Sequence, residues 1–207
     1  MSTTSRSPIH PSWAALLLAL IMVLAAPLRP AVAEQDPVAF VAALGTQGVE
    51  ALASSVFPSE RLARLRALLQ QDFDVGGIGL FALGRYRLSA TPQEQQEFFK
   101  LYPDFTVRAL GRRLEEYGGA RFRVIGSRII GGEMVVSSEI VRSDGRHLLL
   151  DWYLIESGGQ YKISDVNVAG LSMKIALRDQ FASWIETNGG RLGALLAVLR
   201  QQIAQVR

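Results

Sequence analysis

The sequence predicts an α+β fold in which a four-stranded antiparallel meander sheet, twisted as such sheets are, packs with about six to seven helices. Two changes of apolar period lead to this prediction. Apolar residues recur at helical spacing over 36–117, alternate with a period of about two over 121–168, and return to helical spacing over 171–205. Glycine-rich turns divide the alternating part at regular intervals, which is typical of consecutive hairpins.

The first 33 residues have the pattern of a cleaved export signal. A start that contains Arg6 and no acidic residue precedes an unbroken apolar run of 14 residues, Trp13–Ala26, and the small residues Ala31-Val32-Ala33 follow. Because the run is shorter than the roughly 20 apolar residues that span a bilayer, we expect cleavage after Ala33. The mature chain, 34–207, is then one domain.

Charge and cysteine content exclude several function classes. Removing 1–33 takes away Arg6 and Arg29 and no acidic residue, which leaves 20 basic and 19 acidic residues. The chain has no long basic run interleaved with aromatic residues, so we expect no nucleic-acid partner. Because cysteine is absent, the chain has no disulfide framework, thiolate nucleophile or lipid-modified cysteine.

Proline and apolar spacing place the first two helices. One begins at Asp36-Pro37, and Phe57-Pro58-Ser59 separates it from a second helix over Glu60–Gln71. The next helical segment, 74–83, contains three glycines that each weaken a helix by about 1 kcal/mol, so we expect it to be loose or kinked. Its Gly77–Ala82 stretch formally fits a dinucleotide fingerprint, but no buried strand precedes it.

The longest helix is predicted from Pro92 to Tyr117. In Thr91-Pro92-Gln93-Glu94, a hydroxyl caps the helix, a proline takes its first position and a carboxylate returns to the cap. Pro103 is expected to kink or split this helix.

The alternating part contains four predicted strands: Arg121–Ile130, Glu133–Arg142, Arg146–Glu156 and Gln160–Val168. Alternate positions predict rows of side chains that combine into one apolar surface. These rows are Met134, Val136, Ser138 and Ile140; Leu148, Leu150, Trp152 and Leu154; and Val166 with Val168. A helix is expected from Ser172, and a last one over Arg191–Ile203.

The polar residues give weak signals for catalysis. His147 is the single histidine of the mature chain, and neither a nucleophile nor an orienting partner is placed beside it. Asp151 and Asp165 lie mid-strand, where they form either a catalytic pair or, as we favour, partners of arginines or backbone groups. Arg85 and Arg87 either meet an anionic head group or form a solvated turn. We predict no catalytic, cofactor-binding or metal-binding residues.

Two blocks of sequence resemble a known family. They are LGRYRLSATPQEQQEFF, with Leu83-Gly84-Arg85-Tyr86, and SDVNVAGLSMKIALRDQFASWIETNGGRLGALLAVLR, with Gly170-Leu171-Ser172-Met173. Their order and spacing resemble the periplasmic phospholipid carriers of the Mla lipid-asymmetry pathway. This family, MlaC, is also known as toluene-tolerance (Ttg2) proteins and has a hopanoid-associated branch. The resemblance covers the chain from about Pro37 to Leu199.

The resemblance implies that sheet and helices enclose an apolar cavity for lipid tails. It also implies a non-enzymatic periplasmic carrier with three kinds of partner: a phospholipid or hopanoid-like lipid, an inner-membrane ABC-type transporter complex, and an outer-membrane lipoprotein. Twelve apolar residues are the lipid-binding candidates: Phe81, Phe98, Phe105, Val136, Ile140, Leu150, Trp152, Leu154, Val166, Val168, Met173 and Phe181.

Two other classes of function stay open at this point. One is a small secreted hydrolase that uses Asp151, Asp165 or His147. The other is a structural or adaptor domain that binds only proteins. Apolar periodicity identifies burial but does not distinguish a filled core from a cavity, so each lipid-binding candidate can also be an ordinary core residue.

Overall fold

The computed structural model describes residues 35–53, 57–114, 117 and 119–205. The predicted export signal and its cleavage site lie outside the described residues. In the described part of the chain, no helix combines the length and the apolar character needed to cross a membrane.

The described helices agree with the predicted number of about six to seven. They are α2 (Pro37–Ala53), α3 (Pro58–Asp72), α4 (Val75–Leu83), the short 3₁₀ helix η1 (Gly84–Leu88), α5 (Pro92–Leu114), α6 (Met173–Thr187) and α7 (Leu192–Gln205). The predicted start of α5 is confirmed atom by atom. The Glu94 backbone N–H donates to Thr91 Oγ1 at 3.2 Å, and the Thr91 backbone N–H donates to Glu94 Oε2 at 2.9 Å.

Two helices are more regular than expected. α5 continues through Pro103 as one helix, so of the two outcomes predicted there, a kink or a split, the split is wrong; Phe98 and Tyr102 before the proline and Phe105 after it all pack in the helical core. α4 is a nine-residue helix that Asp74 caps by accepting a 2.9 Å hydrogen bond from Gly77 N–H. Gly79 lets α4 approach α5 closely, since a Cβ there would lie 2.9 Å from the Phe99 ring.

The sheet has five strands, so the predicted number of four is corrected. Their order is that of the sequence: β1 (Arg121–Ile130), β2 (Glu133–Val141), β3 (His147–Ser157), β4 (Gln160–Val168) and β5 (Leu171–Ser172). All neighbouring strands are antiparallel, as predicted.

The fifth strand depends on a tight turn after β4. Ala169 and Gly170 have φ angles of 50° and 84°, which reverse the chain so that Leu171 pairs with Val168. A strand of two residues is too short to show alternation, so the pattern gave no signal for it. The helix predicted from Ser172 follows at once, because Ser172 Oγ caps α6 by accepting from Ile175 N–H at 3.2 Å.

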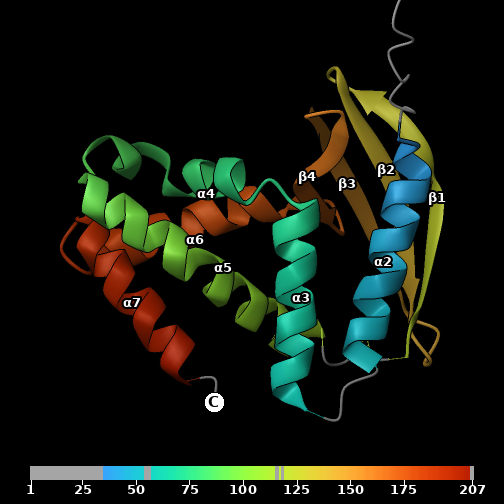
Figure 1. The fold of residues 1–207 in the computed structure, drawn as a ribbon, viewed down its shortest axis with the longest axis horizontal. Coiled ribbons are helices and arrows are strands. Elements are labelled where there is room, and N and C mark those ends of the chain that lie inside the picture. Colours follow the sequence, from blue (N-terminus) through green and yellow to red (C-terminus); the bar gives the residue numbers. More distant parts are fainter. Residues whose placement is uncertain (1–34, 54–56, 115–116, 118, 206–207) are drawn as a thin grey trace, which may run out of the picture. The chain divides into compact units, whose positions relative to one another are not determined.

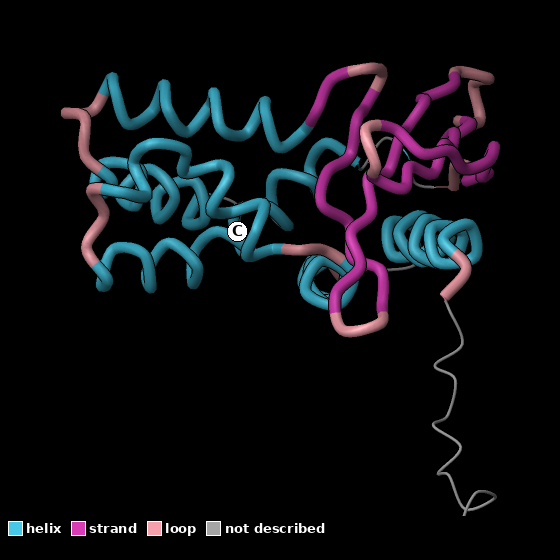
Figure 2. The backbone as a smooth tube through the Cα atoms, turned by 90° about the horizontal axis from the view of Figure 1, so that it is seen from above, coloured by secondary structure: helices cyan, strands magenta, loops and turns pink. Residues whose placement is uncertain are grey.

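The helices are arranged in two groups around the sheet (Figures 1 and 2). α2 packs across β1 and β2, whereas α4, α5, α6 and α7 form a helical group beside the sheet. α3 contacts α2, α5 and β4, and α6 also reaches β4, so both link the helical group to the sheet. The fold therefore offers two separate apolar interiors, one within the helical group and one on the sheet.

Candidate functional site

One face of the sheet collects the three apolar rows that alternation predicts. Strand register places Trp152 opposite both Val136 and Val166, and Leu150 opposite both Ser138 and Val168. Residues directly opposite each other in an antiparallel pair share a face, so the rows of β2, β3 and β4 form one surface, as predicted. We call this surface the apolar face.

α2 covers one end of the apolar face. Phe40, Val41 and Leu44 of α2 pack with Val136 and, on the neighbouring strands, with Leu154 and Ile163, and all six are buried. Gly45 of α2 lies so close to the Phe122 ring that any Cβ would clash with it. This end of the face is a packed core.

The other end of the apolar face is only partly covered. Ala120, Ile140 and Leu150 are buried there, and six apolar side chains packed against them keep part of their surface accessible. One is Tyr117; the other five, which we call the half-buried set, are Phe122, Leu148, Trp152, Val166 and Val168. Phe122, Trp152 and Val166 also pack against the core under α2. Large apolar side chains that meet on one face without being fully buried leave surface for an apolar ligand.

Trp152 is fixed within this surface. Its indole Nε1–H donates a 2.8 Å hydrogen bond to Ser138 Oγ, and Ser138 is 1% exposed. The Phe122 ring lies edge-on to the indole with 6.1 Å between ring centroids. A polar group that is buried and bonded in this way holds the indole in one orientation while its apolar surface contributes to the face.

The structure divides the twelve predicted lipid-binding residues between different places. Seven lie together on the apolar face: Val136, Ile140, Leu150, Trp152, Leu154, Val166 and Val168. Phe98, Phe105 and Phe181 instead lie in the helical group, where Phe181 is 6.0 Å from Phe98 and 5.8 Å from Phe105 between ring centroids. Phe181 therefore lies close to both other rings, and all three belong to the helical core.

The last two candidates lie at the junction of α4 and α6. Phe81 of α4 is flanked by Lys174 and Arg178 of α6, whose charged groups lie 5.3 and 5.2 Å from its ring centroid. Met173 is the first residue of α6. Phe122 and Leu148 are not among the predicted lipid-binding residues, although Phe122 alternates with Val124 in β1 and Leu148 belongs to a predicted row.

The three residues considered for hydrolysis have structural partners. His147 Nδ1 lies 3.0 Å from Glu139 Oε2, and Arg123 Nε donates to Glu139 Oε1 at 2.8 Å. Hydrogen bonding from His147, followed by that from Arg123, lowers the pKa of Glu139 below its ordinary value. This cluster is an ion-pair network on the sheet face opposite the apolar face.

Asp151 and Asp165 do not form a pair with each other. Asp151 accepts from Ser137 Oγ at 2.5 Å and from Arg128 Nη2 at 2.9 Å. Partial burial raises its pKa, but these bonds together outweigh that effect, and the pKa lies below its ordinary value. Asp165 accepts from Ser172 Oγ at 2.5 Å and from Lys174 N–H at 3.0 Å. The favoured reading, partners of arginine and backbone, is therefore correct for both.

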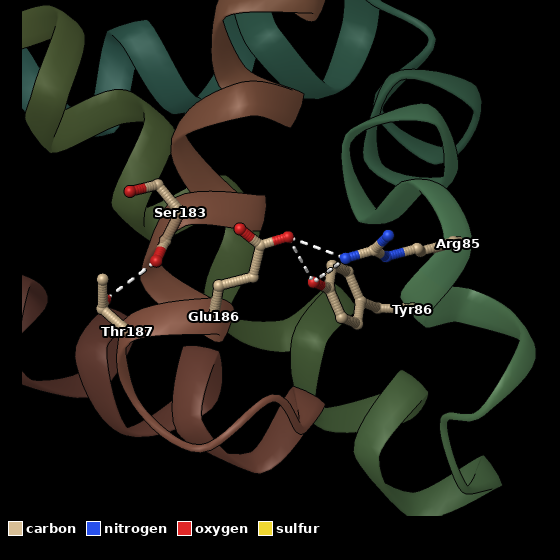
Figure 3. A network of polar contacts seen from close by, with 5 residues as sticks. All are labelled: Arg85, Tyr86, Ser183, Glu186 and Thr187. Atoms are coloured by element: carbon tan, nitrogen blue, oxygen red, sulfur yellow. Dashed lines mark hydrogen bonds and ion pairs between the residues drawn. The ribbon is translucent and has the colours of Figure 1, made fainter.

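Arg85 belongs to a polar network in the helical group (Figure 3). Its Nη2 donates to Glu186 Oε1 at 2.7 Å and to the Tyr86 hydroxyl at 3.0 Å, and the Tyr86 hydroxyl donates to the same Glu186 oxygen at 3.1 Å. This network joins η1 to α6. Arg87 is exposed, and its side chain pairs with no carboxylate among the described residues.

Within the described residues, no group of three or more histidine, aspartate or glutamate side chains is placed to hold a metal ion. The arrangement of the site is thus an apolar face with a half-buried end, supported by polar networks on the opposite side of the sheet.

Comparison with known proteins identifies relatives of the whole fold. The chain is 24% identical over 145 residues to the toluene tolerance protein ttg2D of Pseudomonas putida, covering 69% of this chain and 67% of that protein. A phospholipid-binding protein from Ralstonia solanacearum, solved in complex with a phospholipid, shares the fold with a TM-score of 0.68 and 24% identity, over 83% of this chain and 99% of that one. The model of the MlaC protein family matches residues 48–201, three quarters of the chain, and the protein therefore belongs to the MlaC family.

Proposed function

We propose that this protein is a non-enzymatic periplasmic carrier that holds the acyl chains of a phospholipid against the apolar face of its sheet. The observation that carries the proposal is the half-buried set, in which Trp152, Val166 and Val168 meet on one face without being fully covered. The phospholipid in the similar protein from Ralstonia solanacearum supports this choice of ligand.

The energetic need for such a carrier follows from the hydrophobic effect. A tail of about 16 carbons, at about 0.8 kcal/mol per methylene, costs on the order of 12 kcal/mol to expose to water. Free diffusion of the lipid between membranes is therefore prohibitive. A protein surface that covers most of the tail removes most of that cost, and few polar contacts are needed.

The carrier would exchange its lipid with an inner-membrane ABC-type transporter complex and an outer-membrane lipoprotein. Membership of the MlaC family supports these partners. A hopanoid or another apolar lipid is the alternative cargo, because the apolar face presents no group that selects a straight chain over a ring system.

Lipid extraction tests the proposal. The mature chain is purified from a Gram-negative periplasm, extracted with organic solvent and analysed by mass spectrometry. We expect a phospholipid at close to one molecule per protein. Repeated preparations without any co-purifying lipid would exclude a carrier.

Variants test which face holds the lipid. Trp152→Glu and Val166→Glu place a charge among the tails and should lower lipid occupancy severalfold, since an unpaired charge opposes an apolar ligand. Ile125→Glu is the control, because Ile125 is already 58% exposed on β1. Normal occupancy in folded Trp152→Glu and Val166→Glu proteins would show that the tails lie elsewhere.

A further inference from the structure

A small pocket lies at the end of the hairpin that joins β2 to β3. It has a volume of about 190 Å³ and is lined by Tyr117, Arg142, Arg146, His147 and Leu148. A cavity needs about 10–15 Å³ to hold one water molecule, so the pocket has room for a tetrahedral group of five heavy atoms. Its lining includes two arginines, Arg142 and Arg146.

Strand register places the two arginines directly beyond the apolar face. The backbone N–H of Arg142 donates to the carbonyl of Arg146 at 2.9 Å, so these residues face each other across the hairpin. Arg142 follows Ile140 by two residues, and Arg146 precedes Leu148 by two residues. Ile140 and Leu148 are opposite each other on the apolar face. Because side chains alternate with a period of two, Arg142 and Arg146 continue the same face with cationic groups.

The pocket and the apolar face share residues. Tyr117 and Leu148 line the pocket and also pack in the cluster that contains the half-buried set. The Arg142 guanidinium lies over the Tyr117 ring, 5.3 Å from its centroid. The apolar surface therefore runs into the basic pocket without an intervening element.

Arg146 keeps donors for an anion. Its Nε and Nη2 both approach Asp144 Oδ2, at 2.9 and 2.8 Å, and its side chain is 68% exposed. A guanidinium has five N–H donors, so the two on Nη1 stay available. The His147 side chain points to the opposite face of the sheet, where its Nδ1 contacts Glu139, so the arginines supply the donors on this face. Planar guanidinium groups suit the oxygens of a phosphate.

We propose that this pocket binds the anionic phosphate group of a lipid whose tails lie on the apolar face. The inference rests on the proposed function and adds to it the place and the charge of the head group. Arg142 and Arg146 both contact Asp144, at 3.4 and 2.8 Å, and differ from Arg85 in lying next to the apolar face, whereas Arg85 is paired with Glu186 in the helical group.

The test compares lipids that differ only in the phosphate. Binding of a fluorescent phosphatidylglycerol and of the diacylglycerol with the same tails is measured for the delipidated full-length mature protein. We expect the wild-type protein to bind phosphatidylglycerol about tenfold more tightly, the preference that one charge-assisted hydrogen bond gives. Arg146→Gln should remove most of this preference while diacylglycerol binding stays unchanged.

Two further variants keep the test independent of folding. Lys100→Gln removes one positive charge from an exposed position of α5 and should keep the full preference. Arg142→Lys retains the charge at the more buried arginine, whose side chain is 17% exposed. This variant should keep part of the preference for phosphatidylglycerol. Thermal unfolding of each variant shows that the fold is intact.

The outcomes separate this inference from the carrier proposal. If the protein binds neither lipid, the carrier proposal itself is contradicted. Equal binding of both lipids, or a preference that survives in Arg146→Gln, overturns the head-group site and leaves the carrier in place. Glycerol phosphate without tails should not bind at millimolar concentration; saturable binding of it would identify a site for a soluble phosphate and overturn the link to lipid.

Discussion

The indole of Trp152 on β3 donates its hydrogen bond to the buried hydroxyl of Ser138 on β2, at 2.8 Å. Both side chains lie on the apolar face, where water has little access to Ser138. The bond therefore satisfies a buried polar pair, and it also fixes the orientation of the indole, the largest side chain of the half-buried set.

Ser138→Ala should lower the free energy of unfolding by about 1–3 kcal/mol, because it leaves the indole N–H without its acceptor. In the Ser138→Ala protein, Trp152→Phe should lower the free energy of unfolding by less than it does in the wild-type protein, because it removes the indole N–H that Ser138→Ala leaves unpaired. Urea unfolding of the two single variants and the double variant measures this coupling. Ser127→Ala, at an exposed position of β1, is the control with no expected effect, and additive single effects would contradict the coupling.

Asp165→Ala should destabilise the protein by about 2–3 kcal/mol. Asp165 is 6% exposed, and its carboxylate accepts from Ser172 Oγ, from Lys174 N–H and from Val166 N–H. Alanine leaves these donors unpaired at the start of α6, whereas Asp165→Asn keeps one acceptor and should cost less.

Urea unfolding gives the overall cost of these changes, and hydrogen exchange of the first turn of α6 locates it. Asp179→Ala is the control, because Asp179 is exposed and pairs only with its neighbour Arg178 among the described residues. If Asp179→Ala lowered the free energy of unfolding as much as Asp165→Ala does, the hydrogen bonds of Asp165 would not be the cause of the loss.

The stability of the helical group should fall in strong alkali. Burial raises the pKa of Tyr102 to about 12, above its ordinary value of 10.0. The folded state thus favours the neutral hydroxyl, and its contribution is complete below pH 10 and is lost as the pH rises to about 12. This difference between the two pKa values corresponds to a loss of about 2–3 kcal/mol in the free energy of unfolding.

Tyr102→Phe should remove this part of the pH dependence. The free energy of unfolding is measured between pH 9 and 12 for the wild-type protein and for the variant. Tyr161→Phe, in the cluster between α2 and the sheet, keeps Tyr102 and should keep the slope. The same slope in Tyr102→Phe would assign it to another group.

Gly79→Ala and Gly76→Ala should have opposite effects although both lie in α4. A Cβ at Gly79 would lie 2.9 Å from Phe99 and 3.3 Å from both Phe98 and Tyr102, so we expect a loss of about 1–3 kcal/mol from overpacking. At Gly76 the nearest atom is 3.9 Å away, and alanine should stabilise the helix by about 0.5–1 kcal/mol. Thermal unfolding of both variants tests this, and a similar shift for the two would contradict the close approach of α4 and α5.

Local signals in the sequence were sufficient for most of the elements. Thr91 and Glu94 identified the start of α5, and glycine turns placed the boundaries of the four longer strands within about one residue. Alternation identified the side chains that share the apolar face. These features depend on residues close together in the chain, which is why a pattern reveals them.

Tertiary structure decided what covers each apolar residue. Phe181 and Val166 both follow apolar patterns, yet Phe181 is enclosed by other rings, whereas Val166 stays half-buried although it packs against both apolar clusters of the sheet. The pairing that brings Arg142 and Arg146 together at the end of that face is likewise a property of the hairpin. Periodicity shows which side of an element is buried; the amount of cover depends on residues distant in the chain, which only the packed structure brings together.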